Sequence, residues 1–428
     1  MRREASERLR AQLVESGAAG IVLTTTDNVG YLSGFESVMD GWRQPEPIAA
    51  VFVPASANLP VTLFLPEASL IGLVVAAREG QDVLFDRLRT FDFLNFCVTA
   101  RSTDMDLELP ADVAEELNAL SNCIDGNCAS NIINALADCL HHQGLVAETV
   151  LFDDLRVGMA LNQANGQKYA DGLETIMAAR SIKTSGEIAV FRETGEKADR
   201  VMAFTVGELR CGRSWAEIEK RVAHFMIDED IDPLPHSPML FGGSYDTIFR
   251  PDLFRTFYDK PFGHGDIAIL ETQGRYKNTW IDISRTAHFG KAPPAYREQH
   301  AQVQRCFAEM VAQLKPGANT AAICESVRSG AAQALAVPDK LLMIIHSIGR
   351  VPLESPVSFP STGLLAATEG FEVKASMVLS VDCLYFGSRY GPSHMENVFL
   401  IGEERTESLY KYPLDLIEVL QGTVIDDS

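Results

Sequence analysis

The sequence lacks the features that mark membrane and secreted proteins. Nowhere in the 428 residues does an apolar run approach the roughly 18 residues of a membrane-spanning helix. The chain starts with the charged residues Arg2, Arg3 and Glu4, without the apolar core of a signal peptide. We therefore expect a cytoplasmic protein with no membrane partner.

Positive charge is also scarce. The chain has 37 Lys and Arg residues against 58 Asp and Glu residues, which gives a net charge of −21. Such an excess of negative charge opposes contact with a phosphate backbone or an anionic membrane. We therefore do not expect nucleic acid as a partner.

The eight cysteines are scattered, and the one close pair, Cys123 and Cys128, has no matching second pair. This argues against a thiolate zinc site or a disulfide framework and favours a reduced protein. Glycine-rich phosphate loops and nucleophile elbows of the required form are missing as well, so a nucleotide cofactor is not supported.

Length and patterning predict two α/β domains. A chain of this length exceeds one hydrophobic core. Short apolar runs in the first part suggest a small α/β domain, in which residues 97–126 read as an irregular insertion. Long helical patterns at 187–209 and 296–314 open a second, α+β part. With the stretch 162–166 read as a loop or linker, we expect domains at residues 1–170 and 171–428.

Five side chains in the second domain form a candidate metal-ligand set. Four carboxylates and an imidazole suit Mn, Fe, Co or Zn better than a structural thiolate site would. Taken singly, each acid could be a solvated surface group and the histidine a core residue. The five are Glu271, Asp282, His346, Asp382 and Glu396.

The spacing of these residues favours a shared site. Glu271 and Asp282 flank the turn-like stretch 274–278, and a turn centred between 276 and 277 would place them directly opposite each other, with Cβ atoms about 5 Å apart. A second hairpin, centred on residue 389, would place Asp382 opposite Glu396. His346 ends a third apolar run, so two hairpins and one further strand could present all five side chains to one point. Cys383 alternates to the other strand face and is expected in the core.

The order of these residues resembles that of the pita-bread metallohydrolases, which include Xaa-Pro aminopeptidase, prolidase, methionine aminopeptidase and creatinase. Residues 180–188 resemble the entry to their catalytic domain, residues 265–266 the turn before the first ligand strand, and residues 282–286 the second-ligand motif. Residues 28–35 resemble the N-terminal domain of the creatinase and prolidase branch.

The resemblance implies a creatinase-like N-terminal α/β domain and a C-terminal pita-bread domain, whose antiparallel strands are backed by helices. It also implies one or two divalent ions per subunit and a homodimer, closest in character to the creatinase-like branch. In such a site Asp282 and Glu396 would bridge two ions, or Asp282, His346 and Glu396 would hold one.

Several positions depart from the family pattern. The family usually has Asp at position 271 and Glu at 382, whereas here Glu271 and Asp382 reverse the two lengths and keep the charge. His394 stands where the peptidases often carry arginine. Because it shares the strand face of Glu396, it is a candidate catalytic residue, either as a proton donor or as a partner that positions a ligand.

Two accessory histidines of the peptidases have no counterpart here. Leu353 stands at one position, and the other falls near Arg250, with His236 too far upstream to replace it. In the peptidases these histidines help to bind and protonate the reacting group. We therefore expect a small, non-peptide substrate with an amide or amidine C–N bond. Glu354, after Leu353, is a candidate proton shuttle or else a surface acid.

Three residues are candidates for substrate binding: Trp42, Arg43 and Arg250. An arginine beside an aromatic ring suits a small carboxylate, and in creatinase-like dimers the N-terminal domain reaches the partner's active site. For Trp42 and Arg43 a solvated loop is the alternative. Besides the hydrolase, a lyase of the dimethylsulfoniopropionate-cleaving type, an Xaa-Pro peptidase and an inactive binding scaffold remain open.

Overall fold

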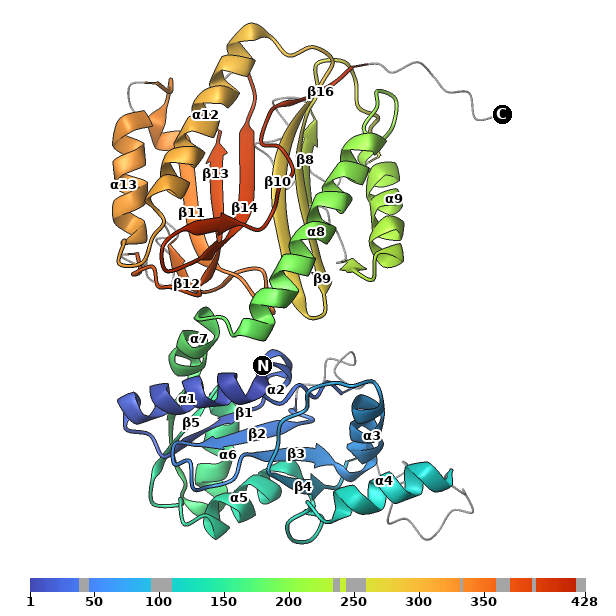
Figure 1. Ribbon diagram of the computed structural model, residues 1–428, viewed down its shortest axis with the longest axis vertical. Coiled ribbons are helices and arrows are strands. Elements are labelled where there is room, and N and C mark those ends of the chain that lie inside the picture. Colours follow the sequence, from blue (N-terminus) through green and yellow to red (C-terminus); the bar gives the residue numbers. More distant parts are fainter. Residues whose placement is uncertain are drawn as a thin grey trace. The chain divides into compact units, whose positions relative to one another are not determined.

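The computed structural model describes residues 1–37, 46–93, 110–233, 239–243, 259–331, 334–358, 370–386 and 390–420. The chain divides into two compact units, Met1–Arg180 and Ser181–Ser428 (Figure 1). The boundary expected after residue 170 lies just before α7 (Leu173–Ser181), whereas the division falls within the last turn of that helix. Trp42, Arg43, His236 and Arg250 lie outside the described residues.

The first unit is built on a mixed six-stranded sheet with the strand order β4-β3-β2-β1-β5-β6. Alternating residues of its strands face two separate clusters: Leu23 and Val51 pack with α1 and α2, and Val22 and Phe52 with α5 and α6. The strands are β1 (Gly20–Leu23), β2 (Ala50–Pro54), β3 (Thr62–Pro66), β4 (Arg87–Phe91), β5 (Thr149–Phe152) and β6 (Lys168–Asp171). The helices are α1 (Arg2–Ser16), α2 (Thr26–Ser33), α3 (Leu70–Arg78), α4 (Ala111–Ser121), α5 (Ile132–His142) and α6 (Leu155–Asn165).

Two local predictions for this unit were wrong. Residues 111–121, expected to be irregular, form α4, which packs against α3 through the buried Leu117. Residues 162–165, expected to be a loop, are the last turn of α6, and Gly166 ends that helix with φ 79°. The polar residues there are the exposed side of a helix whose other side buries Val157 and Leu161.

The second unit contains a ten-stranded sheet with the central order β12-β11-β13-β14-β10-β9-β7. Neighbours along this path are antiparallel. Its strands are β7 (Asp232–Pro233), β8 (Met239–Gly243), β9 (Ile267–Tyr276), β10 (Thr279–Phe289), β11 (Leu341–Ser347), β12 (Glu354–Ser358), β13 (Val378–Tyr385), β14 (Ser393–Ile401), β15 (Thr406–Ser408) and β16 (Ile417–Val419).

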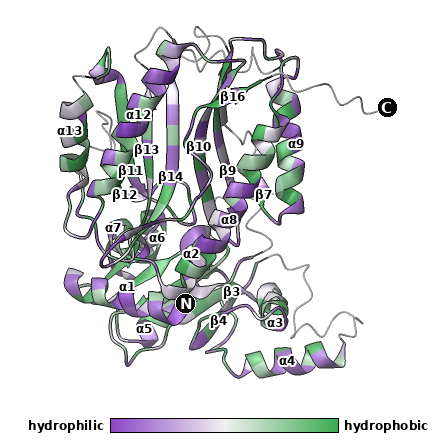
Figure 2. Cartoon of the chain, turned by 45° about the horizontal axis from the view of Figure 1, so that its top comes forward, coloured by the Kyte–Doolittle hydropathy of each residue, from purple (hydrophilic) through white to green (hydrophobic). Residues whose placement is uncertain are grey.

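Helices cover one face of this sheet. Ile281 and Ile283 of β10 pack with α8 (Ser185–Glu208) and α9 (Trp215–Asp228). Val381 and Cys383 of β13 pack with α12 (Pro294–Gln313) and α13 (Thr320–Ala331), which confirms that Cys383 is a core residue. Hydrophilic and hydrophobic residues are interleaved along α9 (Figure 2), as expected for a helix with one buried side. The alternate strand residues therefore project to the opposite face.

Among the described residues, no helix combines the length and the apolarity needed to cross a membrane.

Candidate metal centre

The hairpin of β9 and β10 has a different register from the one predicted. Glu271 pairs with Ser284, and Asp282 pairs with Gln273. The turn consists of Lys277 and Asn278, whose φ values of 47° and 58° are those of a tight two-residue hairpin turn. Its centre lies one residue later than predicted, so the expected direct pairing of Glu271 with Asp282 was wrong.

The error in register does not separate the two acids, because Asp282 lies two residues before Ser284 and so faces the same side of the sheet. The second hairpin has the predicted register, since Asp382 pairs with Glu396. His346 pairs with Ser380, two residues before Asp382. Five adjacent strands thus supply one candidate ligand each.

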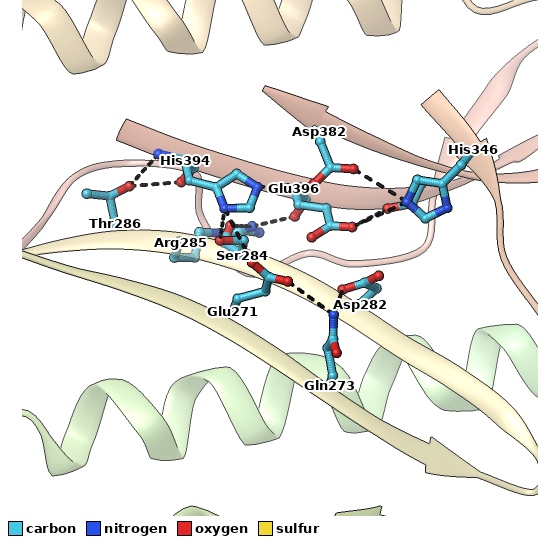
Figure 3. Close-up of polar contacts among 11 residues, drawn as sticks. Glu271, Gln273, Asp282, Ser284, Arg285, Thr286, His346, Asp382, His394 and Glu396 are labelled. Atoms are coloured by element: carbon cyan, nitrogen blue, oxygen red, sulfur yellow. Dashed lines mark hydrogen bonds and ion pairs between the residues drawn. The ribbon is translucent and has the colours of Figure 1, made fainter. Parts of the chain in front are cut away.

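The register arranges these residues in rows across the sheet. Glu271, Ser284, Glu396 and Asp382 form one row, from β9 to β13. Because β10 and β13 both run antiparallel to β14, Asp282 and His346 lie on one side of this row. His394, two residues before Glu396 on β14, lies on the other side. All six side chains point toward one another (Figure 3).

All six candidate residues are buried, with exposed fractions between 1% for Glu396 and 9% for Glu271. This excludes the alternative that the acids are solvated surface groups. His346 Nε2 lies 3.5 Å from Asp382 Oδ2 and 4.0 Å from Glu396 Oε1. Its Nδ1 lies 2.9 Å from the Ser347 carbonyl oxygen. That contact satisfies the proton on Nδ1, so Nε2 is the nitrogen that faces the acids and would offer its lone pair to a bound ion.

His394 belongs to the same cluster. Its Nε2 lies 3.1 Å from Asp382 Oδ1, and its Nδ1 lies 3.7 Å from Glu271 Oε2. The Ser284 hydroxyl is 2.9 Å from the same Nδ1. The expectation that His394 shares the face of Glu396 is therefore confirmed by its position.

The electrostatics of the cluster call for a cation. Burial, together with the charge of neighbouring acids, raises the pKa of Glu271 to about 7 and the pKa values of Asp282 and Glu396 well above their usual range. Burial acts on Asp382 in the same direction. Hydrogen bonds from His346 and His394 outweigh it, however, and lower the pKa of Asp382 to about 2. A divalent cation would offset the repulsion among these carboxylates.

Neighbouring polar side chains orient the acids. Gln273 Nε2 donates to Glu271 Oε1 at 3.1 Å and to Asp282 Oδ1 at 3.2 Å. Ser380 Oγ donates to Glu396 Oε1 at 2.6 Å. Sequence reasoning missed both residues, although each lies two positions from a predicted ligand on the same strand, so strand alternation could have found them.

Arg285 fixes the backbone behind the site. Its guanidinium is fully buried and donates to the carbonyl oxygens of Ser284, Glu396, Tyr412 and Pro413. These bonds tie β10 to β14 and to the segment that follows β15. Burial lowers the pKa of Arg285 to about 10, so this arginine remains a cation at neutral pH.

Two groups of three candidate ligands lie close enough to hold an ion each. Asp282, His346 and Glu396 offer ligand atoms within 4.8 Å of one another, and so do Asp382, His394 and Glu396. Carboxylate oxygens and imidazole nitrogens are the donors that Mn, Fe, Co and Zn accept. The residues present therefore fit a divalent metal.

Glu354 is buried, so its interpretation as a surface acid was wrong. It lies on β12 next to Ser347, and its Oε2 faces Lys183 Nζ at 3.4 Å. The backbone N–H of Arg350 donates to its Oε1 at 2.8 Å. Leu353, at the position of the missing histidine, is 55% exposed.

Comparison with known proteins identifies the family. The model of metallopeptidase family M24 matches residues 189–403, which contain all six residues of the cluster. The chain belongs to this family. The probable dipeptidase PepE of Mycobacterium bovis is 22% identical over 369 residues, which cover 82% of this chain and 93% of that protein.

Solved structures of this family share the fold. The dipeptidase of Pyrococcus horikoshii superposes with a TM-score of 0.71 at 17% identity, covering 97% of this chain and 99% of that one. The X-Pro aminopeptidase of Thermotoga maritima gives a TM-score of 0.68 at 17% identity, with the same coverage. The predicted α/β class and pita-bread architecture are confirmed.

Members of this metallopeptidase family use divalent metal ions, and the acidic and histidine cluster is compatible with them, so the predicted class of cofactor is confirmed. The creatinase-like branch, the homodimer and the cytoplasmic location stay predictions.

Proposed function

We propose that this family M24 enzyme hydrolyses an amide or amidine C–N bond in a small, non-peptide substrate. The observation that carries the proposal is the convergence of two ligand triads on the shared carboxylate of Glu396. The position of Leu353 supports the non-peptide part, because an exposed leucine cannot bind or protonate a peptide group as a histidine does.

The residues of the cluster have separate roles in this proposal. A divalent ion bound there would supply Lewis-acid chemistry, because it would lower the pKa of a water molecule and polarise the carbon under attack. Asp282, His346 and Glu396 would bind such an ion, while Gln273 and Ser380 orient the carboxylates. Arg285 holds the strands of Asp282 and Glu396 together from behind.

Glu354 remains our candidate for moving a proton. It lies on β12, the strand next to that of His346, and its carboxylate is held between Lys183 and the backbone N–H of Arg350. Trp42, Arg43 and Arg250 remain proposed substrate-binding residues.

A dipeptide is the second candidate substrate. It is favoured by the relatives, which are named a probable dipeptidase, a dipeptidase and an X-Pro aminopeptidase. A panel of cyclic and acyclic amidines, N-acyl amino acids, and dipeptides with and without proline distinguishes the two classes. Turnover of the dipeptides alone would contradict the non-peptide proposal.

The test of hydrolysis uses protein freed of metal by a chelator and reloaded with Mn, Fe, Co or Zn. We expect activity to return with metal, and one product to carry ¹⁸O from labelled water. An unlabelled product together with an alkene would indicate the lyase instead.

The matched variants are Asp282→Asn in the cluster and Asp232→Asn, whose side chain on β7 of the same sheet is 75% exposed. We expect Asp282→Asn to lower kcat/KM by more than about 100-fold. Mutating a residue that only hydrogen-bonds a metal ligand already lowers activity about 10- to 100-fold, and the loss of a ligand itself should have a larger effect. Asp232→Asn should retain activity. Full activity of Asp282→Asn, or turnover without metal, would overturn the proposal. Binding of a small molecule without any turnover would indicate the inactive scaffold instead.

A further inference from the structure

We propose that His394 is itself a metal ligand, so that two ions are bound and each receives one imidazole. The inference rests on the metal centre of the proposed function and extends it. One ion would be held by Asp282, His346 and Glu396, the other by Asp382, His394 and Glu396, with the Glu396 carboxylate shared.

The arrangement of rows supports two separate sites. Glu396 and Asp382 lie in the central row, while His346 and His394 lie on opposite sides of it. Each imidazole directs Nε2 at a different oxygen of Asp382, His346 at Oδ2 (3.5 Å) and His394 at Oδ1 (3.1 Å). Two nitrogen donors on opposite sides of one carboxylate row suit two ions better than one.

The chemistry of position 394 also supports the inference. The arginine that this position often carries in the resembling peptidases has only N–H donors and no lone pair, so it cannot coordinate a metal. Imidazole offers a nitrogen lone pair. The exchange of arginine for His394 therefore turns a group that can only donate hydrogen bonds into one that can bind an ion.

Three departures from the family pattern are joined in one chain of contacts. Glu271, His394 and Asp382 each differ from the residue usual in the family. His394 contacts the other two, at 3.7 Å and 3.1 Å. The longer acid at 271, the shorter acid at 382 and the imidazole between them form one altered side of the site, and two of them, Asp382 and His394, are ligands assigned to the second ion.

The surroundings of His394 allow the required tautomer. The Ser284 hydroxyl lies 2.9 Å from Nδ1, and a hydroxyl oxygen can accept the proton of that nitrogen. Nε2 would then present its lone pair to the acids. His346 has the same arrangement, with Nδ1 held by the Ser347 carbonyl oxygen.

The competing role for His394 is positioning, in which it only hydrogen-bonds Asp382 and Glu271. Metal affinity alone does not separate the two roles, because losing a partner of a ligand also weakens binding about 10- to 100-fold. The number of imidazoles bound per ion does separate them. It can be counted in Co²⁺-loaded protein from the outer-shell scattering of the rings in X-ray absorption fine structure.

The experiment combines this count with Co²⁺ stoichiometry from equilibrium dialysis. We expect the wild type to bind two ions with an average of one imidazole each. His394→Arg, which restores the donor usual in the family, should bind one ion fewer or show half the imidazole count per ion. His141→Arg is the matched control, because His141 is exposed on α5 of the first unit.

If the wild type binds two ions with an average of half an imidazole per ion, only one histidine coordinates metal. This result would overturn the assignment of His394 as a ligand, but it would not contradict the proposed function. Unchanged stoichiometry and imidazole count in His394→Arg would overturn it as well. If that variant does not fold, the wild-type count still decides. A wild type that binds no divalent ion would overturn the proposed function too.

Discussion

Asp382 and His394 contact each other diagonally across β13 and β14, with Oδ1 3.1 Å from Nε2, although the direct partner of Asp382 is Glu396. His346 approaches the other oxygen of Asp382. Two imidazoles thus hold the pKa of Asp382 low against the effect of burial, whereas burial raises the pKa values of Glu271, Asp282 and Glu396. Without a bound metal, the raised pKa values of these three carboxyl groups therefore favour their protonated forms.

We predict that the metal-free protein loses stability as the pH rises from 5.5 to 8. The pKa of Glu271 is about 7 in the folded chain, above its ordinary value of 4.5, so the folded state binds the proton more tightly. The resulting stability is complete below pH 4.5 and lost as the pH rises through 7, and the loss between pH 5.5 and 8 is on the order of 2 kcal/mol. The midpoint of thermal unfolding should fall accordingly.

The control for this prediction is Glu271→Gln, which removes the titrating group and should reduce the pH dependence. Saturating Mn²⁺ should reverse the trend, because metal binding strengthens as the ligands lose protons. A metal-free wild type that is more stable at pH 8 than at pH 5.5 would contradict the assignment.

Replacing Arg285 should destabilise the second unit. Arg285→Met removes the donors from four carbonyl oxygens at once, two of them in fully buried hydrogen bonds, so we expect a loss of about 3 kcal/mol or more, measured by urea unfolding. Arg305→Met on α12, where the arginine is 55% exposed, should change stability by less than about 0.5 kcal/mol. Equal effects of the two variants would count against the bracing role of Arg285.

Lys183 and Glu354 should behave as an energetically coupled pair. Both are 1% exposed, so Glu354→Gln removes the carboxylate that faces a buried ammonium, at a cost of about 3 kcal/mol or more. The double variant Lys183→Met/Glu354→Gln should lose less stability than the sum of the two single variants. Additive losses in a double-mutant cycle would show that the pair is not coupled.

The β9–β10 turn should be sensitive to the residue at 278. Asn278 has φ 58°, a conformation that β-branched residues adopt only with strain. We expect Asn278→Val to cost about 1–2 kcal/mol and to weaken Co²⁺ binding, because this turn sets the register of Glu271 and Asp282. Asn278→Gly should retain both stability and metal affinity, and equal behaviour of the two variants would exclude a backbone cause.

Spacing and strand alternation predicted part of the site, whereas the pita-bread architecture was predicted from the resemblance to a known family. The spacing of Asp382 and Glu396 predicted their pairing, and strand alternation placed Cys383 in the core. The β9–β10 register could not be predicted in this way, because several turns fit residues 274–278, and the positive φ of Lys277 is unusual for lysine.

Long-range contacts lay beyond sequence reasoning. Nothing in the local pattern of Glu354 indicates that it meets Lys183, 171 residues earlier in the chain. Likewise, the sequence placed His394 on the face of Glu396. Its contact with Glu271, however, depends on the pairing of β9, β10 and β14 in one sheet.

Each of the five predicted ligands comes from a different strand. These five strands are neighbours in the sheet, although β9 and β14 are far apart in the chain. A hairpin of this unit contains at most two of those residues and the segment from β11 to β14 contains three, so all five come together only in the complete sheet. An ion therefore cannot organise the chain in the way that zinc organises a small finger, because the sheet must assemble first. Metal binding would therefore serve as a measure of the correct assembly of all five strands.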